Sequence, residues 1–221
     1  MASAGKVLSL LPPKTGVTLV AENLTVERGG RRLTSGLSFR LGAGEAMLVT
    51  GPNGAGKSSL LRVLAGLLRQ GSGVCRLEGV AGDEPEPGFH AHYVGHAEAS
   101  KGALTALENL DFWSAMLRRE GVAGLEPQKA LEKLSIGHAG RFPAAYLSAG
   151  QKRRLALARL LVAPRPLWLL DEPVTALDAA TQAQFATIMR EHLDAGGLIV
   201  AATHAPLGLE NARELQLGAA A

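Results

Sequence analysis

Residues 51–59, with the sequence GPNGAGKSS, limit what this 221-residue chain can fold into more than any other stretch. They match the pattern G-x-x-x-x-G-K-[ST], in which glycines let several backbone N–H groups point inward at a polyphosphate. The apolar run at residues 46–50 predicts a buried strand before this loop, and a helix is expected to begin near Lys57. The positive end of that helix dipole favours anions. We therefore predict a strand–loop–helix phosphate-binding unit, against the alternative of a glycine-rich turn without that role.

The side chains of the loop suit a nucleotide bound with its metal. Lys57 is expected to reach the β- and γ-phosphates, and the Ser58 hydroxyl is expected to bind Mg²⁺. The predicted phosphate contacts come from the whole loop, Gly51, Pro52, Asn53, Gly54, Ala55, Gly56, Lys57, Ser58 and Ser59.

The composition is that of an ordinary globular α/β protein, with 47% hydrophobic and 19% charged residues. The net charge of +3 is too small to argue for nucleic acid or for a membrane surface. The single cysteine, Cys75, excludes an intramolecular disulfide and suits a reducing cytoplasm. The apolar patch at residues 7–11 is too short to span a bilayer, so any membrane association is expected to come through a partner.

The hydrophobic pattern, with glycine and proline at the boundaries between elements, predicts a loose tail at residues 1–16 and one domain at 17–217. Residues 17–41 alternate like β-strands around a turn at Gly29 and Gly30, and the helix after the phosphate loop is expected to run through Leu67. Residues 104–119 read as an amphipathic helix with a Thr105–Glu108 capping box and an apolar face that includes Met116. With the helix predicted from Ala149 to just before Pro164, this gives a helical subdomain at about 98–160.

Two further polar groups follow apolar strands. Asp171 and Glu172 come directly after the run at 167–170, and His204 follows the run at 198–202. Because parallel strands end at one edge of a sheet, we expect these side chains to meet the phosphate loop there. Adjacent carboxylates suit a Mg²⁺-nucleotide hydrolase, with Asp171 supporting the metal and Glu172 polarising the attacking water. A surface turn before Pro173 is the alternative for this pair, and an isolated histidine is the alternative for His204.

Here the chain resembles the ABC-type ATPases. Leu147, Ser148, Ala149, Gly150 and Gln151 are similar to their signature, and the phosphate loop, Asp171–Glu172, the segment ending in Asp178 and His204 follow the family order. The resemblance implies an α/β P-loop NTPase fold: a RecA-like core with a parallel sheet, an N-terminal antiparallel β subdomain and an inserted helical subdomain. It also implies ATP and Mg²⁺ as cofactors, with Glu172 and His204 catalytic. Ser148 and Gln151 read equally as a helix capping box, which is compatible because a capped N-terminus also binds anions.

The resemblance further implies an ATP-sandwich dimer, in which Ser148 and Gly150 contact the γ-phosphate of a nucleotide held by a second copy. Residues 27–33, 93–96 and 142–154 are similar to the ATP-binding subunit of the haem-export complex of cytochrome c maturation, the CcmA type. That narrower resemblance implies a place on the cytoplasmic side of the inner membrane, held by integral membrane subunits. No residue looks like a haem ligand, so direct haem binding is not expected, and neither is nucleic-acid binding.

The chain departs from the ABC pattern at two positions. Arg28 stands where the family has an aromatic residue against adenine; a guanidinium can stack on a base, which favours loose base selectivity. His96 stands near the place of the family's glutamine, which leaves the coupling to the membrane subunit open. His90, His92 and His96 could suggest a metal site, but we interpret them as loop histidines.

The expected function is ATP-driven work for a transporter-type complex, with a role in the haem-handling step of cytochrome c biogenesis. The alternatives are a non-transport ABC ATPase acting on nucleic acid, an ATPase of an unrelated exporter, and a regulatory module without turnover. The chain shows one ATPase cassette and no heptad repeat between Ser59 and Leu147, which disfavours the first alternative. Glu172 and His204 disfavour the last, and the signature disfavours a small-molecule kinase.

Overall fold

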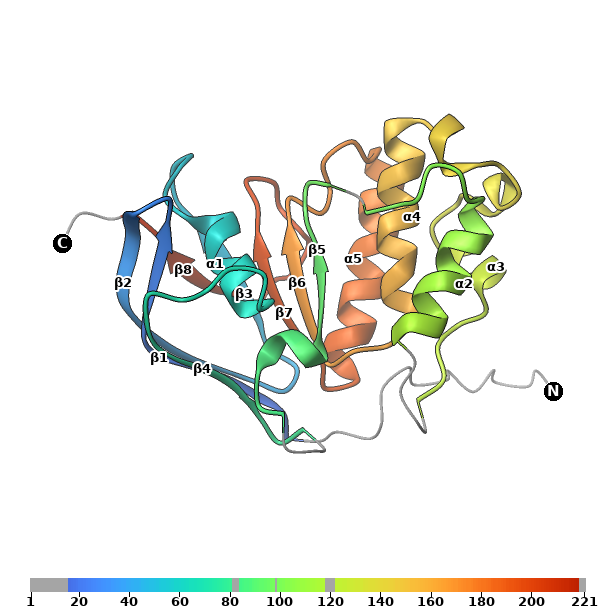
Figure 1. Cartoon of the computed structure of the whole chain (residues 1–221). Coiled ribbons are helices and arrows are strands. Elements are labelled where there is room, and N and C mark those ends of the chain that lie inside the picture. The colour runs from blue at the N-terminus through green and yellow to red at the C-terminus, as the bar shows by residue number, and fades with distance from the viewer. Residues whose placement is uncertain (1–15, 81–83, 98, 118–121, 219–221) are drawn as a thin grey trace.

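A computed structural model describes residues 16–80, 84–97, 99–117 and 122–218, and places them in two sheets flanked by helices (Figure 1). The predicted N-terminal tail therefore lies, up to residue 15, outside the described residues. The smaller sheet is antiparallel, in the order β2-β1-β4. Its strands are β1 (Thr18–Arg28), β2 (Arg31–Gly42) and β4 (Ser72–Glu78). Gly29 and Gly30 make the predicted turn with φ of 58° and 74°, and Cys75 lies in a strand as expected.

The larger sheet is parallel throughout, in the order β5-β6-β7-β3-β8. Its strands are β3 (Ala46–Thr50), β5 (Ala91–Val94), β6 (Leu167–Asp171), β7 (Leu198–Ala202) and β8 (Arg213–Gln216). The three strands predicted to end in polar groups, β6, β7 and β3, are neighbours at the centre of this sheet. Their carboxyl ends therefore open side by side, which is the condition for one shared site.

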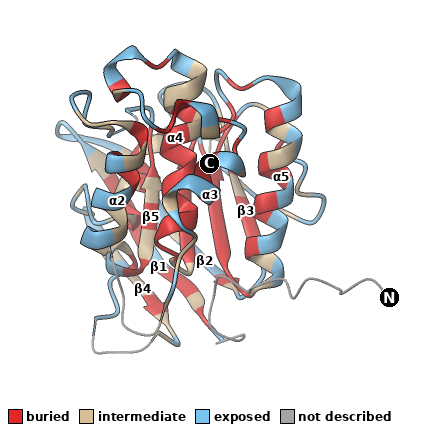
Figure 2. Ribbon diagram, turned by 90° about the vertical axis from the view of Figure 1, so that its right-hand side faces the viewer, coloured by how far each residue is buried: buried red, intermediate tan, exposed pale blue. Residues whose placement is uncertain are grey.

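The two faces of the parallel sheet belong to two hydrophobic cores, because successive strand residues point to opposite faces. Met47 and Val49 pack with the antiparallel sheet and the first helix, whereas Ala46 and Trp168 pack with the later helices. All five residues of β6 and of β7 are buried, which explains their continuous apolar sequences. Figure 2 shows these strands and the inward faces of the helices as buried, with exposed residues on the outward faces.

The helices fall into two groups. One helix, α1, lies between the two sheets, while the others lie on the opposite face of the parallel sheet (Figure 1). Both α2 and α3 pack on α4, through buried Leu110, Ala130 and Leu131. Their bounds are α1 (Lys57–Leu64), α2 (Ala106–Leu117), α3 (Pro127–Glu132), α4 (Ala149–Val162) and α5 (Ala179–Asp194), with short 3₁₀ turns η1 (Pro87–His90), η2 (Gly137–Ala139) and η3 (Ala144–Tyr146). The division at about 98–160 stays a prediction.

The predicted helices are correct in position but not at every residue. The helix after the phosphate loop ends at Leu64, since Gly66 takes a φ of 70° and Leu67 is 65% exposed. In α2 the Thr105–Glu108 capping box is present, but Met116 is 62% exposed and does not join the apolar face. Residues 118 and 119, the expected end of this helix, lie outside the described residues. Among the described helices, none has the length and hydrophobicity needed to cross a membrane.

Candidate functional site

A cavity of about 580 Å³ opens where β3, β6 and β7 end. It contains residues from every segment that the sequence predicted to meet: the phosphate loop, the end of β6 and the end of β7. The lining is Arg28, Gly29, Leu33, Asn53, Gly54, Gly56, Lys57, Ser58, Ser59, Asp171, Glu172 and His204. The arrangement is that of a phosphate-binding loop facing two carboxylates and a histidine.

Lys57 is held inside this cavity by the loop itself. Its Nζ donates to the carbonyls of Gly51 at 2.6 Å and Pro52 at 3.2 Å, and only 9% of the residue is exposed. The same Nζ lies 3.1 Å from Nε2 of His204. Because an ammonium only donates, Nε2 accepts this bond and the imidazole proton sits on Nδ1. An anion that enters the cavity can therefore bind the Lys57 ammonium, whose N–H groups exchange the loop carbonyls for the oxygens of the anion.

Ser58 and Asp171 form a second pair at the start of α1. The Ser58 hydroxyl donates to Oδ1 of Asp171 at 3.0 Å, and the Tyr93 hydroxyl donates to Oδ2 at 3.4 Å. Tyr93 also accepts from Nε of Arg62 at 3.3 Å. Burial raises the pKa of Tyr93, although the bond from Arg62 opposes that shift. Tyr93 was not predicted as a site residue; in the sequence it stands out only as a hydroxyl in the short segment at residues 91–94.

Glu172 is presented to the cavity by an unusual backbone. Its φ is 48°, in the left-handed region, and its N–H donates to the carbonyl of Ala202 on β7 at 2.8 Å. Its Oε2 accepts from the Thr203 hydroxyl at 3.4 Å, and its Oε1 lies 4.0 Å from Nε2 of His204. The turn after β6 therefore aims this carboxylate at the side of the cavity that holds His204 and Lys57. Such local strain persists where surrounding contacts enforce it.

The signature residues lie at the start of α4, and none of them lines the cavity. Ser148 caps the helix: its hydroxyl accepts from the N–H of Gln151 at 3.2 Å, and the Gln151 side chain accepts from its N–H at 2.9 Å. Leu147 is buried beneath the cap, whereas Ser148 and Ala149 are exposed. The exposed cap can meet another molecule but does not reach the cavity of its own chain.

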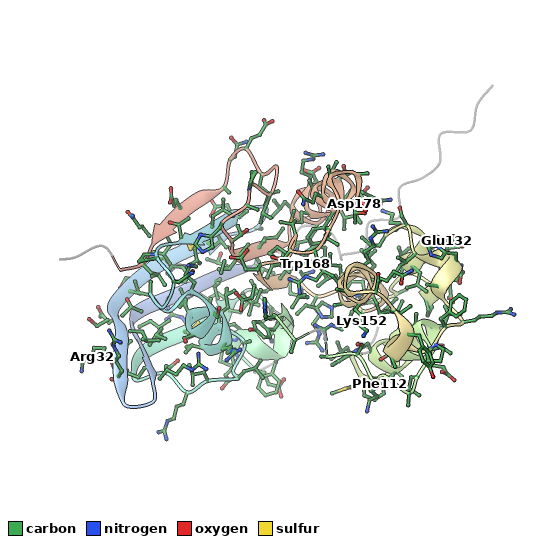
Figure 3. All side chains as sticks on the ribbon, turned by 90° about the horizontal axis from the view of Figure 1, so that it is seen from above. Arg32, Phe112, Glu132, Lys152, Trp168 and Asp178 are labelled. Atoms are coloured by element: carbon green, nitrogen blue, oxygen red, sulfur yellow. The ribbon has the colours of Figure 1, made fainter. Side chains whose placement is uncertain are left out.

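Asp178 lies at the start of α5, beside α4 (Figure 3). Its Oδ1 caps α5 by accepting from the N–H of Thr181 at 2.8 Å, and its Oδ2 pairs with Arg154 of α4. The bonds from Thr181 hold the pKa of Asp178 below its ordinary value, and the charge of Arg154 adds to the effect. A Cβ on Gly150 would lie 3.0 Å from the carbonyl oxygen of Ala176, so α4 packs closely on the segment before α5.

The two departures from the family pattern lie in different places. Arg28 lines the cavity with Leu33, whereas His96 is exposed and is not among the lining residues. The interpretation as loop histidines is wrong for His90 and His92, which lie in η1 and β5 and are 3% and 2% exposed. The ring of His92 bonds the carbonyl of Ala163 at 2.5 Å, and burial lowers its pKa to about 3. Among the described residues, no three His, Cys, Asp or Glu side chains are grouped as a metal site.

The phosphate loop is also supported by the last strand, which the sequence did not predict. The N–H of Leu217 donates to the carbonyl of Thr50 at 2.9 Å, and the Thr50 hydroxyl donates to Glu214 at 2.6 Å. A Cβ on Gly51 would lie 2.3 Å from the carbonyl oxygen of Leu217. The first glycine of the loop is therefore required by the packing of the protein chain itself.

Comparison with known proteins agrees with this geometry. Residues 34–175 match the ABC transporter family. The cytochrome c biogenesis ATP-binding export protein CcmA of Chelativorans sp. (strain BNC1) is 54% identical over 201 residues, covering 91% of this chain and 98% of the relative. The protein of the same name from Mesorhizobium japonicum is 52% identical over 202 residues, with the same coverage of both chains.

Solved structures share the fold at lower identity. A putative ABC transporter ATP-binding protein from Pyrococcus furiosus superposes with a TM-score of 0.75 at 20% identity, covering 90% of this chain and 97% of that one. A dimeric ATP-binding cassette bound to ADP and phosphate gives a TM-score of 0.75 at 24% identity, covering 90% and 94%. Motifs, fold and relatives agree, and the chain belongs to the ATP-hydrolysing cassettes of the ABC transporter family, among the CcmA-type ATP-binding proteins of cytochrome c biogenesis.

Proposed function

We propose that this ATPase drives the haem-handling step of cytochrome c biogenesis, by powering the release or export of haem or of a haem carrier. The observation that carries the proposal is the 54% identity to a cytochrome c biogenesis ATP-binding export protein over nearly the whole of both chains. A match of that extent spans the helices around α4 as well as the cavity.

In the proposed site, the phosphate loop wraps the triphosphate of ATP, and Lys57 leaves its loop carbonyls to bind the β- and γ-phosphates. Ser58 and Asp171 fit a Mg²⁺ ion, because a hydroxyl and a carboxylate 3.0 Å apart are hard oxygen donors of the kind Mg²⁺ prefers. Bound there with the nucleotide, the ion would neutralise charge on the phosphates. Arg28, which lines the same cavity, is proposed to stack on the adenine.

Glu172 is proposed to take a proton from the water that attacks the γ-phosphorus. Once Lys57 has left Nε2 of His204 for the phosphates, that nitrogen is proposed to carry the ring proton and to donate a hydrogen bond to the γ-phosphate. The bond between the γ-phosphorus and its bridging oxygen breaks, giving ADP and phosphate. In the structure, Nε2 of His204 lies 4.0 Å from Oε1 of Glu172 and 3.1 Å from Nζ of Lys57. The three side chains therefore already lie close together in the cavity. They are charged or polar groups set in place before the reaction, which is what transition-state stabilisation requires.

The signature is proposed to act on a second copy of the chain. Ser148 and Gly150 lie outside the cavity of their own chain, and the exposed N-terminus of α4 has the positive dipole end that favours an anion. Two copies facing each other head to tail would place each signature over the other's γ-phosphate, with Asp178 at the contact. ATP would then hold the dimer together, and hydrolysis would release it.

The remaining parts of the proposal concern the partners. Integral membrane subunits of a cytochrome c maturation complex would bind the ATPase on the cytoplasmic side of the inner membrane, and His96 would replace the family's glutamine near that contact. The haem would be handled by those subunits rather than by this chain, and nucleic acid is not proposed as a partner.

A gene replacement in the source organism tests this function. Removal of the chain should abolish covalently haem-stained c-type cytochromes, the parent copy should restore them, and a Lys57→Ala copy should not. Affinity purification from detergent-treated membranes should recover an integral membrane protein with the tagged chain. Normal c-type cytochromes in the absence of the chain would refute the proposed role in cytochrome c biogenesis. That result would not contradict the assignment of the chain as an ATPase.

A further inference from the structure

One buried arginine connects three parts of the candidate site. Arg153 lies in the second turn of α4 and is 4% exposed. Its Nη1 donates to the carbonyl of Gly95, just beyond the end of β5, at 2.7 Å. Its Nη2 donates to the carbonyls of Asp171 at 2.9 Å and Glu172 at 2.5 Å, and its Nε donates to that of Pro173 at 3.0 Å. One rigid guanidinium on α4 thus binds four backbone carbonyls, one just after β5 and three in the turn at the end of β6.

Three of those carbonyls belong to the turn that aims the proposed general base. Glu172 holds a φ of 48°, which a residue with a side chain adopts only under constraint. The bond from its N–H to Ala202 fixes one side of the turn, and the guanidinium binds the carbonyls on the other side. With both sides held, the Glu172 carboxylate faces Thr203 and His204 in the cavity.

We propose that Arg153 is a positioning residue, which holds the Glu172 carboxylate where it can take a proton from the attacking water. The same guanidinium connects the Glu172 turn to the helix that carries the signature, α4, and to the end of β5. The proposal rests on the proposed role of Glu172. It explains why a cation is buried among backbone carbonyls at this position: a guanidinium offers five donors in a fixed plane, whereas a lysine offers one point charge. Through α4, a shift of the signature on meeting a second copy would reach Glu172 directly.

The test compares ATP turnover and ATP binding in Arg153→Lys and Arg153→Gln with the parent chain. Misplacement of a catalytic group by about 1 Å can cost about 10²-fold in rate, so kcat should fall by about 10-fold to 100-fold. The KM for ATP and the affinity for a fluorescent ATP analogue should stay within about threefold of the parent, since Arg153 does not line the cavity. Arg153→Lys should retain more activity than Arg153→Gln.

Arg159→Lys is the matched control. Arg159 is a second buried arginine of α4, 6% exposed, and it donates to the carbonyl of Tyr93 at 2.6 Å and packs over the ring of Trp113. It supports the fold in a similar way but does not contact the Glu172 turn. Its variant should lower the melting temperature comparably while leaving kcat within about threefold of the parent.

A double variant separates positioning from general support. If Arg153 acts through Glu172, adding Arg153→Lys to Glu172→Gln should not slow the residual single-turnover hydrolysis further. Additive losses, an unchanged kcat, a raised KM with kcat retained, or unfolding of both Arg153 variants at 25 °C would each overturn the proposal. Failure of the proposed role of Glu172 is distinguishable, because it would show as parent-level hydrolysis in Glu172→Gln alone.

Discussion

The ammonium of Lys57 and the imidazole of His204 lie 3.1 Å apart, although the two residues come from opposite ends of the chain. The contact exists because β3 and β7 are parallel neighbours, so the loop after one strand and the residues after the other open at the same place. Lys57 is thus held by its own loop carbonyls and by a histidine, ready to exchange those partners for phosphate oxygens.

Replacing Lys57 with Ala should remove most of the ATPase activity. The buried ammonium is the cation nearest the expected phosphates, and loss of one such transition-state contact costs about 10²- to 10³-fold in kcat. Phosphate release measured at saturating ATP is the assay. Lys129→Ala, which alters an exposed lysine of α3 outside the cavity, should retain parent activity. Retained turnover and affinity in Lys57→Ala would contradict the whole site.

Glu172→Gln should preserve ATP binding and stop hydrolysis, because an amide keeps the shape of the side chain but cannot accept the proton of the attacking water. Gel filtration with ATP and Mg²⁺ should then show an ATP-dependent dimer that the parent chain does not accumulate. The control is Glu210→Gln, a carboxylate outside the nucleotide cavity. Hydrolysis at the parent rate in Glu172→Gln would contradict the role of Glu172 as the group that takes a proton from the attacking water.

Arg28→Ala should weaken ATP and GTP binding to a similar extent. A guanidinium stacks on either purine, and an exposed contact of this kind is worth about 0.5–1 kcal/mol, or about twofold to fivefold in affinity. Competition against a fluorescent nucleotide measures both affinities. Arg32→Ala, on the same hairpin but outside the cavity lining, should change neither. A loss confined to ATP would show that the base is recognised by hydrogen bonds instead.

Acid should destabilise the fold through two buried histidines. Burial lowers the pKa of His92 and of His192 to about 3, while both return to about 6.5 on unfolding. Between those values the unfolded chain binds more protons, so the free energy of unfolding falls as pH drops below about 6.5. From pH 7 to pH 5 each histidine should cost about 2 kcal/mol.

Urea unfolding at the two pH values measures this loss. His192 stacks on Trp168 with ring centroids 3.8 Å apart, so His192→Phe keeps an aromatic partner and should remove about half of the pH dependence. If the free energy of unfolding of His192→Phe depended on pH as strongly as that of the parent, groups other than His192 would be responsible for the pH dependence.

The sequence predicted the phosphate loop, the capped start of α4 and the convergence of Asp171, Glu172 and His204, because each depends on local pattern or on the geometry of parallel strands. It did not predict Tyr93 as a partner of Asp171, since that contact depends on the pairing of β5 with β6. The burial of His90 and His92 was missed for a similar reason. Side chains of histidine are buried or exposed according to tertiary packing, and neither spacing nor neighbours along the chain reveal which.

The contact between the last described strand and the phosphate loop sets an order of assembly during synthesis. Strand β3 and its loop leave the ribosome early, whereas β8, which pairs with β3, follows more than 150 residues later in the chain. Its other neighbour, β7, is also made late, so until then both edges of β3 lack partners, which exposes backbone groups to pairing with other chains. A nascent fragment that already carries the whole phosphate loop therefore lacks the support of Leu217, and nucleotide cannot bind to the finished form of the loop until translation of the domain is nearly complete.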